Sequence, residues 1–211
     1  MSQYHKINTV FKRDERGRII YGEWSTPELK YLQNLSWEFT EKIDGTNIRV
    51  MWDGANISFG GKTDRAEIQS GLLDTLKAKF DNQEARFADI FNDATEVCLY
   101  GEGFGNKIQK VGNLYDPDGN DFALFDVRVG KWWLERQAVE EIADRLGIIC
   151  VPFMGHGTLN QAISYVKQEH MSSFGKAPME GIVARPDVQL FARTGERIIA
   201  KIKHRDFVEA Q

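Results

Sequence analysis

The chain has 211 residues, of which 42% are hydrophobic and 27% are charged, a composition typical of one well-buried globular domain. No apolar run reaches the roughly 20 residues that a membrane-spanning helix needs, and residues 1–6 lack the apolar core of a secretion signal. The net charge of −4 argues against a protein that coats nucleic acid by bulk electrostatics, although it is compatible with a local basic groove.

The first half of the chain alternates between helical and strand patterns. Leucines at positions 29, 32 and 35 follow Ser25-Thr26-Pro27-Glu28, which predicts a helix with proline in its first turn. From Trp37 the apolar residues recur at every second position, which predicts a strand that is broken at Asp44-Gly45. The other elements expected here are a hairpin of residues 47–52 and 56–59, helices at 72–80 and 87–91, and a strand at 97–100.

The second half of the chain continues with strands and irregularly spaced helices. The expected elements are strands at 122–129 and 148–153, helices at 135–146 and 159–166, and final strands at 181–185 and 198–203. This order predicts an α+β fold with largely antiparallel sheets rather than a series of βαβ units. Since no repeat or linker interrupts the pattern, we expect residues 1–211 to form a single domain.

Two glycine-rich segments imitate phosphate-binding motifs without meeting their requirements. Gly60-Gly61-Lys62-Thr63 ends like a P-loop, but the position of the first P-loop glycine is occupied by Asn56. Residues 101–105 resemble a dinucleotide fingerprint, but Asn106 stands where the third glycine belongs, and no βαβ unit surrounds them. Both classes of nucleotide-binding protein are therefore excluded.

The informative pattern is a set of four short segments in which charged residues stand at the ends of expected strands. The segments are residues 41–47, 99–103, 179–183 and 199–203. Together they supply three lysines and three carboxylates, each flanked by apolar residues: Lys42, Lys201, Lys203, Asp44, Glu102 and Glu180. This pattern indicates one cleft lined with charge.

The order and spacing of these segments resemble the nucleotidyltransferase superfamily of ATP-dependent ligases and capping enzymes, from Lys42 to Lys203. Lys42-x-Asp44-Gly45 is similar to the first motif of that superfamily, and residues 101–103 are similar to the third. The fourth and fifth motifs correspond to residues 180–183 and Lys201-x-Lys203, and residues 122–126 resemble an intermediate motif whose aromatic residue stacks on the base. The resemblance implies an adenylylation domain in which two mainly antiparallel sheets flank a nucleotide cleft.

Two departures from the superfamily pattern narrow the resemblance to RNA ligases. Thr46-Asn47 replaces the arginine that DNA ligases and capping enzymes place at position 47, and residues 101–110 are similar to phage-type RNA ligases of the RNA ligase 2 family. The implied reaction has three steps. The enzyme adenylylates itself with ATP, transfers AMP to an RNA 5′-phosphate, and seals that end to a 3′-hydroxyl.

Only eight residues follow Lys203. We therefore expect neither an oligonucleotide-binding barrel nor a helical C-terminal domain, and an accessory RNA-binding partner could supply that function.

The resemblance also assigns roles to individual residues. Lys42 would be the nucleophile that becomes covalently bound to AMP, and Lys201 and Lys203 would hold the α-phosphate. Glu180, with Asp44, would bind Mg²⁺ or Mn²⁺. The remaining nucleotide-binding candidates are Glu102 for the ribose, Phe125 rather than Phe122 for adenine, and Lys62 and Arg65 for the nucleotide or the 5′-phosphate. Arg49 is either a further basic residue of this kind or an outward residue of its hairpin.

Three other functions stay open at this stage. The same fold serves DNA ligases and GTP-dependent capping enzymes, and a catalytically dead module could bind nucleotides or RNA. The two cysteines, Cys98 and Cys150, suggest neither a disulfide framework nor a zinc site, which favours a cytoplasmic protein in a reducing setting. By analogy with small phage and bacterial repair enzymes, we expect a monomer that acts in RNA repair, in the host cytoplasm if phage-encoded.

Overall fold

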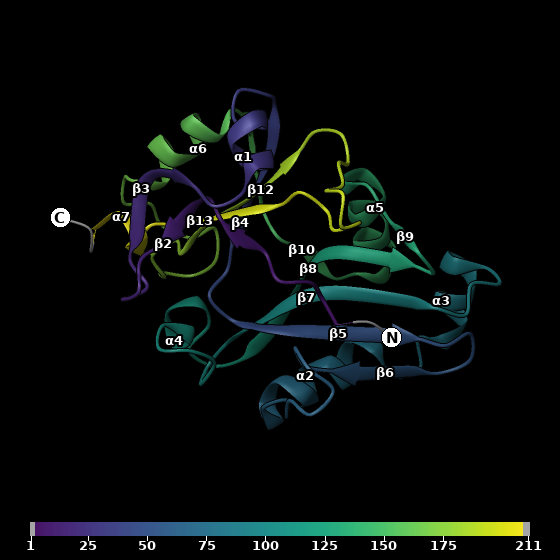
Figure 1. Cartoon of the computed structure of the whole chain (residues 1–211). Coiled ribbons are helices and arrows are strands. Elements are labelled where there is room, and N and C mark those ends of the chain that lie inside the picture. Colours follow the sequence, from purple (N-terminus) through teal and green to yellow (C-terminus); the bar gives the residue numbers. More distant parts are fainter. Residues whose placement is uncertain (1–2, 209–211) are drawn as a thin grey trace. The chain divides into compact units, whose positions relative to one another are not determined.

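The computed structural model describes residues 3–208, which form two compact units (Figure 1). Unit 1 contains residues 3–4 and Asp44–Val151, and unit 2 contains His5–Ile43 and residues 152–208. Within the described residues, every helix is too short or too polar to cross a membrane.

Unit 1 is built on a six-stranded sheet in the order β10-β8-β7-β5-β6, with β9 beside β8. The strands are β5 (Thr46–Trp52), β6 (Ile57–Gly60), β7 (Val97–Gly105), β8 (Asn120–Val129), β9 (Trp132–Trp133) and β10 (Ile149–Cys150). All pairs are antiparallel except β10 with β8. The helices of this unit are α2 (Ser70–Phe80), α3 (Glu84–Phe91), α4 (Gly112–Tyr115) and α5 (Arg136–Leu146).

One face of the unit 1 sheet is covered by helices, and the other carries polar side chains. Ile48, Val50 and Trp52 of β5 join the core with the apolar sides of α2, α3 and α5. Because side chains alternate along a strand, Asn47 and Arg49 lie on the opposite face. The strands therefore present a row of functional groups on the face that the helices leave uncovered.

Unit 2 contains a five-stranded sheet in the order β1-β13-β12-β4-β11 and a separate hairpin of β2 and β3. The strands are β1 (Asn8–Thr9), β2 (Phe11–Arg13), β3 (Ile19–Trp24), β4 (Trp37–Lys42), β11 (Phe153–Gly157), β12 (Gly181–Pro186) and β13 (Ala200–Lys203). The helices are α1 (Pro27–Leu32), α6 (Leu159–Val166) and α7 (Arg205–Val208). The apolar side of α6 packs with Trp37, Ile182 and Ile202 in the core of this unit.

Most of the expected elements are confirmed, as is the α+β class with largely antiparallel sheets. The single strand expected at 148–153 is wrong. The chain leaves the unit 1 sheet after β10, and beyond Pro152 it enters the unit 2 sheet as β11. The apolar run concealed this change of sheet, because both short strands are partly buried. The hairpin of β2 and β3 was not predicted, and the organisation as a single domain stays a prediction.

Replacing Phe80 by alanine is expected to lower the free energy of unfolding by about 3–5 kcal/mol. Phe80 is 1% exposed, and its ring contacts Phe59, Phe87 and Phe122. Urea titration followed by circular dichroism measures the change. The control is Leu114→Ala, which should change the value by less than about 0.5 kcal/mol because Leu114 is 41% exposed. Equal effects of the two substitutions would contradict this packing.

Candidate active site

The register of three neighbouring strands in unit 2 brings two of the predicted lysines beside one carboxylate. Gly181 of β12 pairs with Lys42 of β4 on one side and with Lys203 of β13 on the other. Glu180 directly precedes Gly181, so its side chain emerges between the two lysines. Alternation places Lys42, Lys201 and Lys203 on the sheet face opposite the apolar core of this unit.

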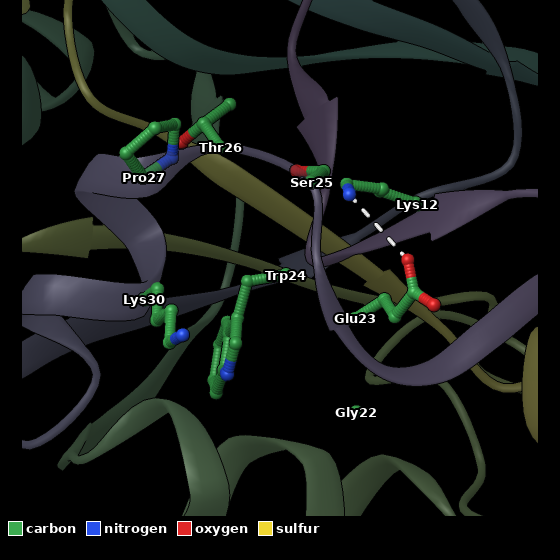
Figure 2. Close-up of a pocket in the computed structure, with 8 residues that line it drawn as sticks. All are labelled: Lys12, Gly22, Glu23, Trp24, Ser25, Thr26, Pro27 and Lys30. Atoms are coloured by element: carbon green, nitrogen blue, oxygen red, sulfur yellow. Dashed lines mark hydrogen bonds and ion pairs between the residues drawn. The ribbon is translucent and has the colours of Figure 1, made fainter.

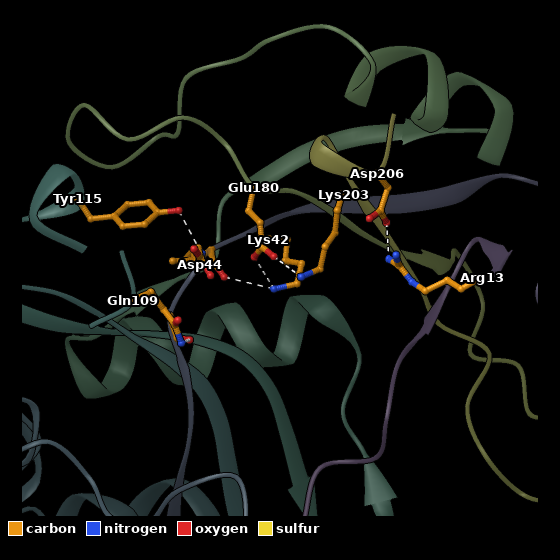
Figure 3. A network of polar contacts seen from close by, with 10 residues as sticks. Arg13, Lys42, Asp44, Gln109, Tyr115, Glu180, Lys203 and Asp206 are labelled. Carbon is orange, nitrogen blue, oxygen red and sulfur yellow. Dashed lines mark hydrogen bonds and ion pairs between the residues drawn. The ribbon is translucent and has the colours of Figure 1, made fainter. Parts of the chain in front are cut away.

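The side chains form a compact ion cluster around Glu180. Lys42 Nζ lies 2.6 Å from Glu180 Oε2, and Lys203 Nζ binds Oε1 (Figure 3). The three side chains are 22%, 11% and 14% exposed in the order Lys42, Glu180 and Lys203. Burial acts to raise the pKa of the Glu180 carboxyl, but the positive charges and hydrogen bonds of the two lysines outweigh burial. The pKa therefore lies below its ordinary value of 4.5.

Lys201 adds a third positive charge to this face of the sheet. Burial lowers the pKa of its ammonium group, and the positive charges of Lys203, Lys42 and Arg13 lower it further. The side chain of Arg13 is itself bound to Asp206 at 2.6 Å. Three lysines thus lie on the face of the sheet that carries Glu180, and two of them bind its carboxylate. This concentration of positive charge favours an anion such as a phosphate group.

Glu41, the neighbour of Lys42 on β4, is a buried carboxylate on the opposite face of the sheet. It is 2% exposed, accepts a hydrogen bond from the Ser172 hydroxyl, and accepts a second from the Ser173 backbone N–H at 3.0 Å. The Ser172 oxygen in turn accepts from the Phe174 N–H at 3.0 Å. Glu41 therefore ties β4 to the segment that leads into Glu180. Sequence reasoning missed this role, although Glu41 lies within the first charged segment.

The turn after Lys42 belongs to unit 1 and lies against the end of β7. A Cβ atom at Gly45 would lie 2.3 Å from the Gly103 carbonyl oxygen and 2.8 Å from Glu102 Cγ, so only glycine fits. The Asp44 N–H donates to the Tyr115 hydroxyl at 3.1 Å, and Gln109 Nε2 donates to the Gly45 carbonyl at 2.9 Å (Figure 3). The structure thus places Gly45, the neighbour of Asp44, against Glu102. Gln109 lies within residues 101–110, but the sequence assigned no role to it or to Tyr115.

A β-bulge directs Phe125 away from the core of unit 1. The pairing of β7 with β8 shifts between Tyr100 and Gly101, which leaves Phe125 as the extra residue. Phe122 is fully buried in the core, in the space that the missing side chain of Gly101 leaves open. The expected separation of the two phenylalanines onto different faces is therefore confirmed.

The surroundings of Phe125 come from a distant part of the chain. The rings of Tyr4 and Phe125 meet edge to face at 5.1 Å, and the Tyr4 hydroxyl donates to Asp126 Oδ2 at 2.7 Å. Tyr4 also contacts Tyr100, whose ring centroid is 5.1 Å away. Tyr4 lies outside every motif of the chain, so its sequence context offered no signal for this contact.

Arg49 is a buried residue that holds the loop bearing two of the predicted phosphate ligands. It is 1% exposed, so the reading as an outward residue of the hairpin is wrong. Its Nε donates to the Gly61 carbonyl at 2.9 Å, and its Nη2 binds Asp64 at 2.7 Å. Lys62 and Arg65 of this loop are exposed. Arg49 thus supports the loop, and the two exposed cations are the ones available to a ligand.

The predicted metal ligands do not form a closed protein cage. Among residues 3–208, no group of three or more His, Cys, Asp or Glu side chains is arranged to hold a metal ion. Mg²⁺ retains much of its water shell and is commonly bound through one or two carboxylates. Glu180, a carboxylate already surrounded by cationic groups, fits that mode of binding.

Solved structures of RNA ligases share this fold. The chain matches Naegleria gruberi RNA ligase with PPi at 18% identity and a TM-score of 0.66, covering 99% of this chain and 64% of that chain. A mutant of the same ligase with ATP and Mn matches at 18% identity and a TM-score of 0.66, covering 98% and 63%. The chain therefore spans just under two thirds of the length of these proteins. A search of curated proteins gives no significant match.

The family is settled by a family model that describes RNA ligases and matches residues 35–203. This range includes all four charged segments and most of the chain. The chain belongs to the RNA ligase family.

Replacing Glu180 by glutamine is expected to lower the free energy of unfolding by about 3 kcal/mol at neutral pH, because two partly buried lysines lose their counter-ion. Since its pKa is lowered in the folded state, Glu180 stabilises the fold above pH 4.5, and this contribution is lost as the pH falls through the folded-state pKa. The difference in the free energy of unfolding between wild type and variant should therefore become smaller below pH 4.5. Urea titrations over a pH series measure it.

The matched control is Asp89→Asn, which removes the carboxylate from the exposed pair of Asp89 and Arg145. Exposed ion pairs contribute less than about 1 kcal/mol, so this variant should unfold nearly like wild type. A penalty for Glu180→Gln that stays constant at every pH would refute the ion cluster as its cause.

Proposed function

We propose that this chain is an ATP-dependent RNA ligase that adenylylates itself on Lys42. The observation that carries the proposal is the Lys42 ammonium held 2.6 Å from Glu180, on a sheet face that also carries Lys201 and Lys203. Membership of the RNA ligase family supports it, and the Naegleria gruberi relatives include structures with ATP and Mn and with AMP and Mn.

In the proposed first step, Lys42 Nζ attacks the α-phosphorus of ATP. An N–P bond forms, the bond to pyrophosphate breaks, and the uncharged amine gives up one of its two protons. The adenylyl group then passes to an RNA 5′-phosphate oxygen as the N–P bond breaks. Finally, a 3′-hydroxyl attacks that 5′-phosphorus, the phosphodiester forms, and AMP leaves.

Lys42 needs an uncharged amine for the first step, and its ion pair with Glu180 favours the charged ammonium. Glu180, with Asp44, would hold Mg²⁺ or Mn²⁺. When bound there, the cation would supply positive charge that competes with the ammonium for the carboxylate and offsets charge on the phosphates. Neighbouring Lys201 and Lys203 also disfavour a third positive charge.

The other residues are proposed to bind and orient the nucleotide. Lys201 and Lys203 would contact the α-phosphate and stabilise charge that develops during transfer. Glu102 would accept from the ribose hydroxyls, and Phe125 would stack on adenine with its orientation set by Tyr4. Lys62 and Arg65 would bind the outer phosphates or the RNA 5′-phosphate, on the loop that Arg49 supports.

The proposal extends to the setting in which the enzyme acts. Both cysteines are free thiols, which suits a reducing cytoplasm. We propose a monomer active in RNA repair, with an accessory RNA-binding protein as a further partner.

Incubation with α-labelled ATP and Mg²⁺ should attach label to the wild-type chain that survives denaturation. Lys42→Ala should carry none, because the attacking nitrogen is missing. Lys201→Ala is expected to lower the labelling rate about 100-fold, the typical loss when one group that stabilises transition-state charge is removed. Lys77→Ala, which removes an exposed lysine of α2, serves as the control. Label from GTP alone would indicate a capping enzyme, and complete lack of label a binding module.

Sealing assays test the choice of substrate strand. With ATP and Mg²⁺, the chain should join 5′-phosphate and 3′-hydroxyl ends of RNA, measured on matched nicked RNA, nicked DNA and single-stranded RNA. Lys42→Ala should seal none of them. Sealing confined to nicked DNA would refute the assignment to RNA while leaving self-adenylylation intact.

A further inference from the structure

A pocket of about 370 Å³ lies in unit 2 where β3 leads into α1 (Figure 2). Its volume falls within the range of about 300–1,000 Å³ typical of small-molecule sites. Among the residues that line it are Lys12, Glu23, Trp24, Ser25, Thr26 and Lys30. None of them belongs to the ion cluster of Lys42, Glu180, Lys201 and Lys203.

The walls of this pocket are held in place by contacts within unit 2. The ring of Trp24 packs at a steep angle against that of Phe11, with centroids 5.2 Å apart and planes at 64°. The Ser25 hydroxyl donates to the Thr9 carbonyl, and Thr26 caps α1 by accepting from the Leu29 N–H at 3.3 Å. Trp24 remains partly exposed. The pocket therefore presents a fixed aromatic ring to solvent.

Two lysines bring positive charge to the pocket. Lys12 and Lys30 are both exposed. Lys12 faces Glu23 at 3.4 Å, but the two side chains are 57% and 54% exposed, so the pair contributes little and a stronger anion can displace the carboxylate. Figure 2 shows the Lys12–Glu23 pair and the side chains of Trp24 and Lys30.

The charge of the whole unit matches that of the pocket. Among the described residues, unit 2 contains 15 Lys and Arg residues against 11 Asp and Glu, whereas unit 1 contains 12 against 19. The net charge of −4 therefore conceals a positive unit and a strongly negative one. Lys12 of strand β2 lines the pocket.

We propose that this pocket binds one nucleotide of a single-stranded stretch of the RNA substrate. The base lies against Trp24, and the flanking phosphates are bound by Lys12 and Lys30. An aromatic ring next to cationic side chains is the arrangement by which proteins bind single strands, because every base has a face that can stack and every linkage carries a charge. The inference rests on the proposed RNA ligase activity and adds a substrate contact remote from Lys42.

The test is equilibrium binding of a fluorescent single-stranded oligoadenylate over a salt series. Lys12→Ala combined with Lys30→Ala should weaken binding about tenfold at low salt. The slope of log affinity against log salt should become shallower by about 1.4, since each phosphate contact on a single strand contributes about 0.7. Lys77→Ala combined with Lys131→Ala, two exposed lysines of unit 1, is the charge-matched control and should bind like wild type.

Two further variants separate binding from damage to the fold. Glu23→Gln should strengthen RNA binding about twofold, a gain that a folding defect does not produce. Trp24→Leu keeps an apolar side chain against Phe11 but removes the aromatic ring. It should bind RNA about tenfold more weakly, because stacking on an aromatic ring contributes about 1–3 kcal/mol per base. Trp24→Phe, which keeps an aromatic ring, should restore binding.

Labelling with α-labelled ATP should be unchanged in all these variants, because none of the substituted residues lies in the ion cluster. If wild type is labelled and binds RNA, but the double lysine variant binds as tightly as its control, the pocket proposal is overturned and the ligase proposal stands. Failure of the wild type to be labelled would overturn the ligase proposal instead.

Discussion

The cluster of Lys42, Glu180 and Lys203 depends on a carboxylate that is buried only because two ammonium groups bind it. A buried carboxylate without such partners would be too costly to keep charged. Strand register supplies the partners, since both lysines pair with the residue next to Glu180. A slip of one residue in β4 or β13 would turn its lysine toward the apolar core. The strand register that holds the unit 2 sheet together therefore also places the two lysines beside Glu180.

In unit 1, one sheet carries a large apolar core on one face and polar functional groups on the other. The helices pack on one face, so the opposite face is left for Glu102 and Phe125. Close backbone approach at Gly45 and the bulge at Phe125 set the direction of these groups. Buried Arg49 then fixes a loop whose exposed cations are available to phosphate. The positions of the polar groups thus depend on backbone packing as well as on ion pairs.

The uneven distribution of charge explains how a protein with a net negative charge could bind RNA. The excess of acidic residues lies in unit 1, while unit 2 carries the lysine cluster and the pocket of Trp24. Local potential, rather than net charge, governs where a polyanion binds and how its binding responds to salt. The proposed RNA contact and the proposed adenylylation site thus share the more positive part of the chain.

The sequence by itself determined the fold class, most strands and helices, and the four charged segments, because each depends on local periodicity or on a resemblance over short motifs. It also separated Phe125 from Phe122, since alternation along a strand is a local rule. Only the tertiary structure decided that residues 148–153 divide between two sheets, that Arg49 is buried, and that Glu41 ties Ser172 to β4. These features arise from contacts between residues far apart in the chain, such as Tyr4 with Asp126, and no local pattern encodes such contacts.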